Sequence, residues 1–196
     1  MGKLRKAAVV FPGIGYHTDK PLLFYSKKLA WTNGYEIIDV PYGHFEHGIK
    51  GNEKKMRKAC ESALKQAGEI LKDKDLERYD ELVFLSKSIG TAAAAAYAEK
   101  HHLTDGNGRK VRHIYFTPVA DTFLAARKKS GIVFHGTADP WAPDDIIEKG
   151  CRELELPLYI VPGANHSLET GSVDLDLKNI RKVMARCAEY LMLENR

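Results

Sequence analysis

The sequence has few cysteines, with only Cys60, Cys151 and Cys187 among its 196 residues. An odd number of cysteines at wide spacing does not form a disulfide framework, so free thiols in a reducing compartment are the simplest explanation. We therefore expect a cytoplasmic protein.

The sequence also lacks a long apolar segment and a strong excess of charge. Its longest apolar runs suffice only for a strand, so none is expected to span a membrane. The basic start, MGKLRK, leads into about five apolar residues, fewer than a signal peptide contains. The 30 lysines and arginines are interleaved with 26 aspartates and glutamates, which leaves a formal net charge of +4. Such interleaving, as between residues 50 and 78, indicates solvated helix faces, and we expect no nucleic-acid binding.

Short apolar runs alternate with segments of helical periodicity along the chain. Strands are predicted at 7–11, 35–40, 82–85, 111–116, 131–135 and 158–161. Helices are predicted at 20–30, 51–72, 144–155 and 172–193, and in the alanine-rich segment after Gly90. Most of these strands are continuously apolar, which is typical of a parallel sheet with helices on both faces. The sequence therefore predicts an α/β fold: one doubly wound domain, residues 1–196, with a mostly parallel sheet of about six strands.

The last predicted helix, 172–193, is amphipathic. Its apolar residues form one stripe, which is expected to face the core. The stripe consists of Val173, Leu177, Ile180, Val183, Met184, Cys187 and Leu191.

The segment LVFLSKSIGTAAAAAYA, residues 82–98, changes abruptly from a strand to a helix. The change occurs within SKSIG, residues 86–90, so Ser88 lies at the apex of a very tight turn. Small residues two positions before and after the apex, Ser86 and Gly90, suit a turn in which strand and helix backbones nearly touch. The turn resembles the nucleophile elbow of α/β-hydrolases, usually Gly-x-Ser-x-Gly, with Ser86 in place of the first glycine.

Two further residues follow predicted strands. Asp139 lies in HGTADPWAP, after strand 131–135, and His166 lies in VPGANHSL, after strand 158–161. Taken alone, Asp139 fits an ordinary Asp-Pro turn and His166 an exposed loop histidine. With Ser88, however, they have the residue types, the chain order and the strand-end positions of a Ser-His-Asp triad. The sequence thus resembles a small α/β-hydrolase over nearly its whole length.

The loop FPGIGYH, residues 11–17, lies where α/β-hydrolases have their oxyanion loop. By this resemblance the backbone amides of Ile89 and Ile14 would form the oxyanion hole, with Gly15 as the alternative to Ile14. The loop lacks the third glycine of a dinucleotide-binding motif. Likewise, the SKS segment lacks the upstream glycine of a phosphate-binding loop.

Several residues beside this site are candidates for contact with a substrate. Gly15, Tyr16 and Trp141 lie on the flanking loops, and the two aromatic residues fit either an acyl pocket or ordinary packing. A cation at Lys87 would attract an acidic substrate or lower nearby pKa values, or else the side chain points into solvent. His135 ends a strand and is expected to support the acid loop.

Metal binding is not expected. The histidine pairs His44/His47 and His101/His102 have no cysteines or carboxylates at metal-ligand spacing, and we interpret them as surface residues.

The resemblance implies cleavage of a carboxylic ester or thioester through an acyl-enzyme on Ser88, with a small-molecule substrate and no cofactor. Residues 117–130 leave room for a short helix but no lid, and the family's first two strands are missing. A shallow, open site is therefore expected, which favours a small or exposed acyl group over a long-chain lipid. Acyl transfer on the same triad and ligand binding without catalysis are the alternatives.

Overall fold

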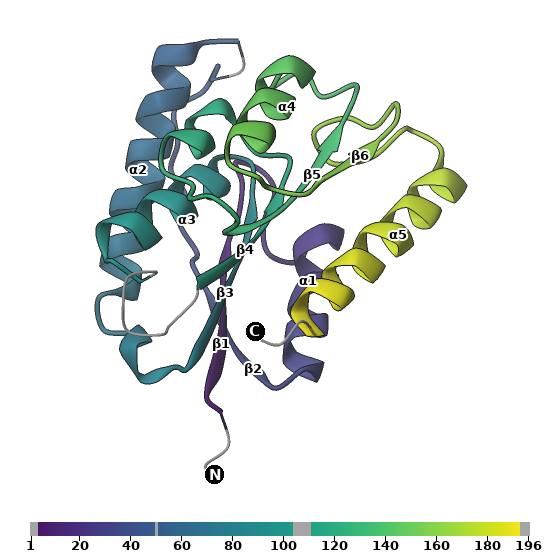
Figure 1. Ribbon diagram of the computed structural model, residues 1–196. Coiled ribbons are helices and arrows are strands. Elements are labelled where there is room, and N and C mark those ends of the chain that lie inside the picture. Colours follow the sequence, from purple (N-terminus) through teal and green to yellow (C-terminus); the bar gives the residue numbers. More distant parts are fainter. Residues whose placement is uncertain (1–3, 50, 104–110, 193–196) are drawn as a thin grey trace.

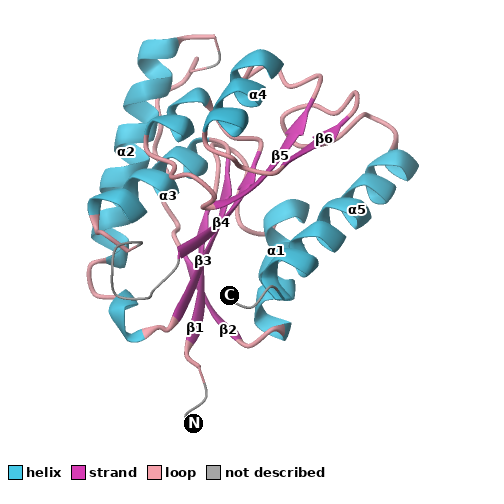
Figure 2. Ribbon diagram, viewed as in Figure 1, coloured by secondary structure: helices cyan, strands magenta, loops and turns pink. Residues whose placement is uncertain are grey.

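The computed structural model describes residues 4–49, 51–103 and 111–192, which form one parallel six-stranded sheet with helices around it (Figures 1 and 2). The strands are β1 (Lys6–Phe11), β2 (Tyr35–Asp39), β3 (Glu81–Lys87), β4 (Val111–Phe116), β5 (Gly131–Gly136) and β6 (Leu158–Val161). The helices are α1 (Pro21–Thr32), α2 (Glu53–Leu71), α3 (Ile89–Lys100), α4 (Asp144–Glu153) and α5 (Val173–Met192), with short 3-10 helices at Leu76–Arg78 and Ala120–Leu124. The predicted parallel sheet and its strands are confirmed.

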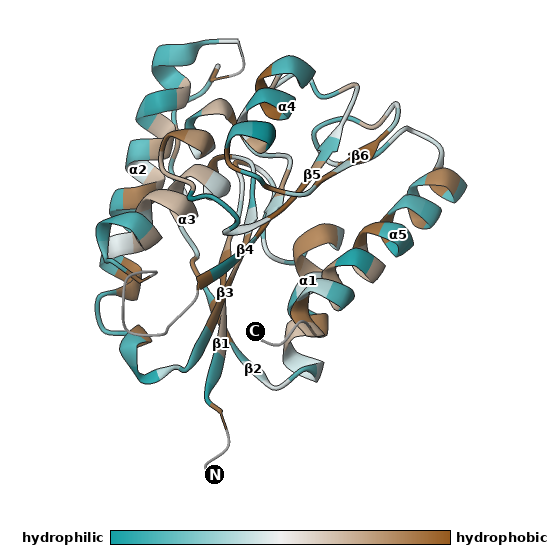
Figure 3. Cartoon of the chain, viewed as in Figure 1, coloured by the Kyte–Doolittle hydropathy of each residue, from teal (hydrophilic) through white to brown (hydrophobic). Residues whose placement is uncertain are grey.

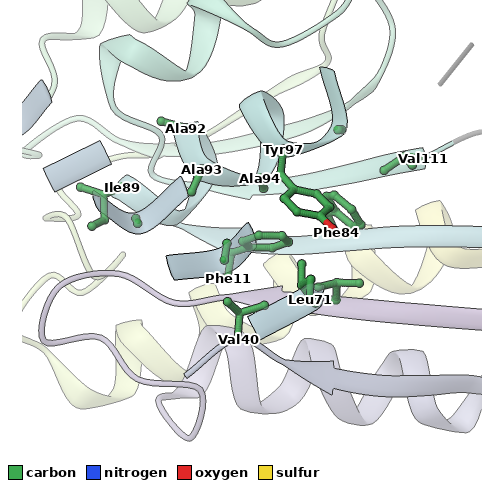
Figure 4. Close-up of a cluster of buried hydrophobic side chains, with 14 of the residues drawn as sticks. Phe11, Val40, Leu71, Phe84, Ile89, Ala92, Ala93, Ala94, Tyr97 and Val111 are labelled. Carbon is green, nitrogen blue, oxygen red and sulfur yellow. The ribbon is translucent and has the colours of Figure 1, made fainter. Parts of the chain in front are cut away.

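Helices cover both faces of the sheet, with α2, α3 and α4 on one face and α1 and α5 on the other (Figure 1). Side chains alternate along a strand, so the apolar residues of β3 enter two different cores. Leu82 and Phe84 pack under α2 and α3, where Phe84 lies beside the ring of Tyr97 (Figure 4). Val83 and Leu85 pack under α1 and α5. Burial on both faces explains why this strand is continuously apolar.

The apolar stripe predicted for α5 is confirmed only in the second half of the helix. Val183, Cys187 and Leu191 are buried, whereas Val173 and Leu177 are 75% and 63% exposed. Figure 1 shows α5 packed against α1 at its C-terminal end and extending past it at its N-terminal end. In Figure 3 hydrophobic colour continues into those first turns. The stripe is therefore longer than the surface it packs against.

All six strands end at the same edge of the sheet, here called the carboxyl edge. The strand order is β2-β1-β3-β4-β5-β6, so the chain moves to one side after β1 and to the other side after β3. In open α/β sheets, ligands bind at such a reversal, outside the carboxyl ends of the two strands. Phe11 at the end of β1 lies beside Ser86 near the end of β3. The fold thus places the predicted oxyanion loop next to the predicted nucleophile.

A close backbone contact joins these two segments. A Cβ atom added at Gly90, in the first turn of α3, would lie 2.4 Å from the carbonyl oxygens of both Phe11 and Pro12. The turn suggested that this glycine serves the approach of β3 and α3, but the nearest backbone belongs to the end of β1.

We expect Gly90→Ala to lower the free energy of unfolding by at least about 2 kcal/mol, because the new methyl group must displace the backbone at the end of β1. Gly68→Ala in α2 is the matched control. Its added Cβ has no neighbour within 4 Å, so we expect it to raise the free energy of unfolding by about 0.5 to 1 kcal/mol. Urea denaturation measures both changes, and equal effects of the two substitutions would contradict the proposed contact.

Candidate active site

Ser88 occupies the turn between β3 and α3 in an unusual backbone conformation. Its φ is 56° and its ψ is −127°, a region that residues other than glycine rarely adopt. Its amide donates a hydrogen bond to the carbonyl of Phe116 at 3.1 Å, and its carbonyl accepts one from the amide of Thr91 at 2.9 Å. The neighbouring strand and the first turn of α3 therefore both hold the turn in place.

The structure brings together the three residues predicted as a triad. Nε2 of His166 lies 2.7 Å from Oγ of Ser88, and Nδ1 of His166 lies 2.7 Å from Oδ2 of Asp139. When Nδ1–H donates to the carboxylate, Nε2 is free to accept the serine proton. A nucleophile, a base and an orienting acid need this arrangement.

The loop after β5 fixes the position of Asp139. The amide of Asp139 donates to the carbonyl of Gly136 at 3.0 Å, and Oδ1 accepts from the amide of Trp141 at 2.9 Å. The other carboxylate oxygen, Oδ2, is then available to His166. Nε2 of His135 lies 2.7 Å from Oδ1 of Asp144, and its Nδ1 lies 3.9 Å from Oδ2 of Asp139. His135 therefore joins the end of β5 to α4 beside the acid, as expected.

His166 is held by contacts that the sequence analysis missed. Thr117, directly after β4, has φ 42° and donates from Oγ1 to the carbonyl oxygen of His166 at 3.0 Å. The half-buried Trp141 stacks on the imidazole, with ring centroids 5.2 Å apart and planes at 21°. Thr117 could have been found, because it is a polar residue directly after a buried strand at the carboxyl edge.

The loop after β1 forms a tight turn beside Ser88. Gly13 and Tyr16 exchange two backbone hydrogen bonds, of 3.1 and 3.3 Å, which leaves Ile14 and Gly15 at the tip. Among the hydrogen bonds of the described residues, none uses the amides of Ile14, Gly15 or Ile89. These amides remain the predicted oxyanion donors, with the choice between Ile14 and Gly15 open.

A second contact that the sequence analysis missed holds this loop from the side of β2. The hydroxyl of Tyr42 donates to the carbonyl of Pro12 at 2.6 Å. Tyr42 follows β2, so the segment after that strand helps to fix the loop that follows β1.

Tyr16 and Lys87, two of the residues expected to contact a substrate, are both buried. Tyr16 is buried, and its hydroxyl accepts a hydrogen bond from the amide of Leu22 at 3.1 Å, which fits ordinary packing. Lys87 is completely buried rather than pointing into solvent, and its Nζ lies 4.9 Å from the centroid of the Tyr16 ring. The physical reason is the alternation along β3. Position 87 lies on the same face as Val83 and Leu85, which helices α1 and α5 cover.

The protonation equilibria of the site are strongly perturbed. Burial lowers the pKa of His166 to about 4, the positive charge of Lys87 acts in the same direction, and the hydrogen bond to Asp139 opposes both. Burial also lowers the pKa of Lys87 to about 7, against the attraction of the Asp139 and Glu169 carboxylates. The imidazole is therefore neutral from mildly acidic pH upward, which is the form that a general base needs.

The remaining predicted features concern metals, thiols and membranes. Within residues 4–49, 51–103 and 111–192, no group of three or more His, Cys, Asp or Glu side chains could hold a metal ion. His44, His47, His101 and His102 are exposed, and the three cysteines are buried and unpaired. None of the helices in this part of the chain has the length and apolar character needed to cross a membrane.

Comparison of the sequence with protein-family profiles and with well-characterised proteins gives no match. The structure, in contrast, is similar to several solved structures. A protein of unknown function from Agrobacterium tumefaciens, provisionally named an alpha/beta hydrolase, is 18% identical with a TM-score of 0.60, over 97% of this chain and 85% of that one. A protein of the alpha/beta superfamily from Xanthomonas campestris, provisionally named a hydrolase, is 14% identical with a TM-score of 0.66, over 95% of this chain and 98% of that one. Est1E from Butyrivibrio proteoclasticus is 12% identical with a TM-score of 0.66, over 97% of this chain and 88% of that one. The chain therefore has the α/β-hydrolase fold.

We expect the imidazole of His166 to titrate with a midpoint near pH 4, well below the ordinary histidine value of about 6.5. Its pKa is lower in the folded than in the unfolded chain, so the unfolded chain binds the proton first as pH falls. The free energy of unfolding should therefore decrease as pH falls from about 6.5 to about 4. NMR titration of the histidine ring signals measures the midpoint, with His166→Gln to assign the signal. A midpoint at or above 6.5 would contradict the burial argument.

Proposed function

We propose that this protein is a serine hydrolase that cleaves a carboxylic ester or thioester through an acyl-enzyme on Ser88. The observation that carries the proposal is the hydrogen-bonded series from Ser88 through His166 to Asp139 at the carboxyl edge. His166 takes the hydroxyl proton as Oγ of Ser88 attacks the substrate carbonyl. Asp139 keeps the proton on Nδ1 and stabilises the imidazolium that forms.

The two half-reactions use the same groups. The tetrahedral oxyanion accepts hydrogen bonds from the amide of Ile89 and from that of Ile14 or Gly15. When this intermediate collapses, the carbon–oxygen or carbon–sulfur bond breaks and the leaving alcohol or thiol takes the proton from His166. A water molecule then attacks the acyl-enzyme while His166 accepts its proton. Release of the carboxylic acid returns Ser88 to its starting state.

We further propose a small or exposed acyl group as the substrate. The connection between β4 and β5 holds only the 3-10 helix Ala120–Leu124, so no lid of helices enters the site from this connection. Half-buried apolar side chains of Ile14, Tyr42 and Trp141 belong to loops at the carboxyl edge and offer contact to such a group. Among the structural neighbours, Est1E has also been solved with ferulic acid bound, and ferulic acid is a small aromatic carboxylic acid.

A fluorophosphonate probe tests this function without knowledge of the substrate, because it reacts with activated serines. We expect labelling of Ser88, located by mass spectrometry of the modified peptide, and its complete loss in Ser88→Ala. Ser86→Ala is the matched control. Ser86 is buried two residues away, and its Oγ donates to the carbonyl of Ile114 at 3.3 Å, so its loss should leave labelling intact. Failure of the folded wild-type protein to react would favour ligand binding without catalysis.

A further inference from the structure

Lys87 is a buried amine directly before the proposed nucleophile, and the mechanism above does not use it. Its side chain has no solvent exposure, and Nζ has no hydrogen-bond partner among the described residues. Burying an ammonium group without hydrogen bonds is unfavourable, and an unbranched apolar side chain would fill the same space without this penalty. The position therefore holds a titratable group where packing alone would favour an apolar one.

Groups from three loops act on this amine, one by direct contact with its charge and the others electrostatically. Tyr16, from the loop after β1, places its ring 4.9 Å from Nζ and stabilises the charged form through a cation–π contact. The carboxylates of Asp139, after β5, and Glu169, after β6, attract the ammonium. The imidazole of His166, also after β6, is repelled by the Lys87 ammonium when the imidazole is protonated. The charge of His135 acts on His166 in the same direction. Burial raises the pKa of Tyr16 to about 12, so that its phenol stays neutral and only the carboxylates carry negative charge here.

We propose that Lys87 is a positioning residue that acts through His166, using its buried charge to set how strongly that imidazole holds a proton. This inference rests on the proposed function, in which His166 is the base of the triad. Lys87 does not touch the substrate in this scheme. Its effect passes through space, from the α1/α5 face of the sheet to the imidazole at the carboxyl edge.

The proposal has a specific consequence for the pH dependence of Ser88 reactivity. Between the pKa of His166, about 4, and that of Lys87, about 7, the imidazole is neutral while the lysine is charged. The imidazolium that forms as Ser88 attacks is then opposed by a nearby like charge. Above the pKa of Lys87 this opposition disappears. Reactivity should therefore rise in two steps, one near pH 4 and one near pH 7.

The experiment measures the rate constant for fluorophosphonate labelling from pH 3.5 to 9 in the full chain. Wild-type protein should show both steps. Lys87→Met removes the charge at similar volume, so we expect a single step, about one pH unit above the first wild-type step. At pH 6 this variant should react roughly threefold to tenfold faster than wild type and reach the same alkaline plateau.

Lys128→Met is the matched control. Lys128 precedes β5 at the opposite edge of the sheet, is 66% exposed, and pairs with Glu155 at 3.3 Å. Removing this lysine should leave both steps unchanged. Lys87→Arg provides a second test that does not depend on the methionine variant folding. Arginine stays charged throughout the pH series, so this variant should keep the first step and lose the second.

NMR titration of His166 separates the two proposals. In Lys87→Met the midpoint of the imidazole should rise by about one unit, whether or not the protein is an enzyme. If no protein is labelled but this midpoint rises, the hydrolase function is wrong and the coupling to Lys87 stands. A single-step wild-type profile, or an unchanged His166 midpoint in Lys87→Met, would overturn the inference about Lys87.

Discussion

The site depends on a backbone contact that leaves no room for a side chain. The first turn of α3 lies against the end of β1 at Gly90, and the loop after β1 lies against the nucleophile turn at Gly13, where an added Cβ would be 2.9 Å from Cβ of Ser88. The serine and one predicted oxyanion donor, the amide of Ile14 or Gly15, come from segments more than 70 residues apart in the chain. Their relative position is nevertheless fixed by this contact. Preorganised donors need such rigidity, because a donor that must first move stabilises the oxyanion less.

A second close contact fixes the histidine in the same way. A Cβ added at Gly136, the last residue of β5, would lie 2.3 Å from the carbonyl oxygen of Ala164, and the amide of Ala138 donates to that oxygen at 2.9 Å. The acid loop and the histidine loop therefore pack backbone to backbone. Together with the hydrogen bond from Thr117, this contact holds His166 between Ser88 and Asp139. The three side chains come from the ends of β3, β5 and β6, so the sheet itself sets their spacing.

Much of this arrangement could be predicted from the sequence, because parallel strands end at one edge and polar residues after them must meet there. Continuous apolar runs predicted the sheet. Positions directly after strands predicted the triad residues, which the structure brings together. The burial of individual side chains was not predicted as well. Alternation along β3 places Lys87 with Val83 and Leu85, a burial that its charge did not suggest. Val173 of α5 shows the opposite error, because it was expected to face the core and is exposed. Helical periodicity identifies an apolar face without showing how far the surface that packs against it extends.

The burial of Lys87 also links stability to chemistry. In the unfolded chain this amine keeps its ordinary pKa of about 10.4, whereas in the fold burial lowers it to about 7. The folded state therefore loses this proton before the unfolded state does, and the contribution of Lys87 to stability increases as pH rises between these values. Below this range the folded protein carries the full unfavourable burial of the charge, offset only in part by Tyr16, Asp139 and Glu169. An apolar residue would avoid that penalty but would exert no field on the imidazole. The unfavourable burial of the amine and the effect of its charge thus have one cause. The low-polarity surroundings that disfavour the ammonium also screen its interaction with His166 only weakly.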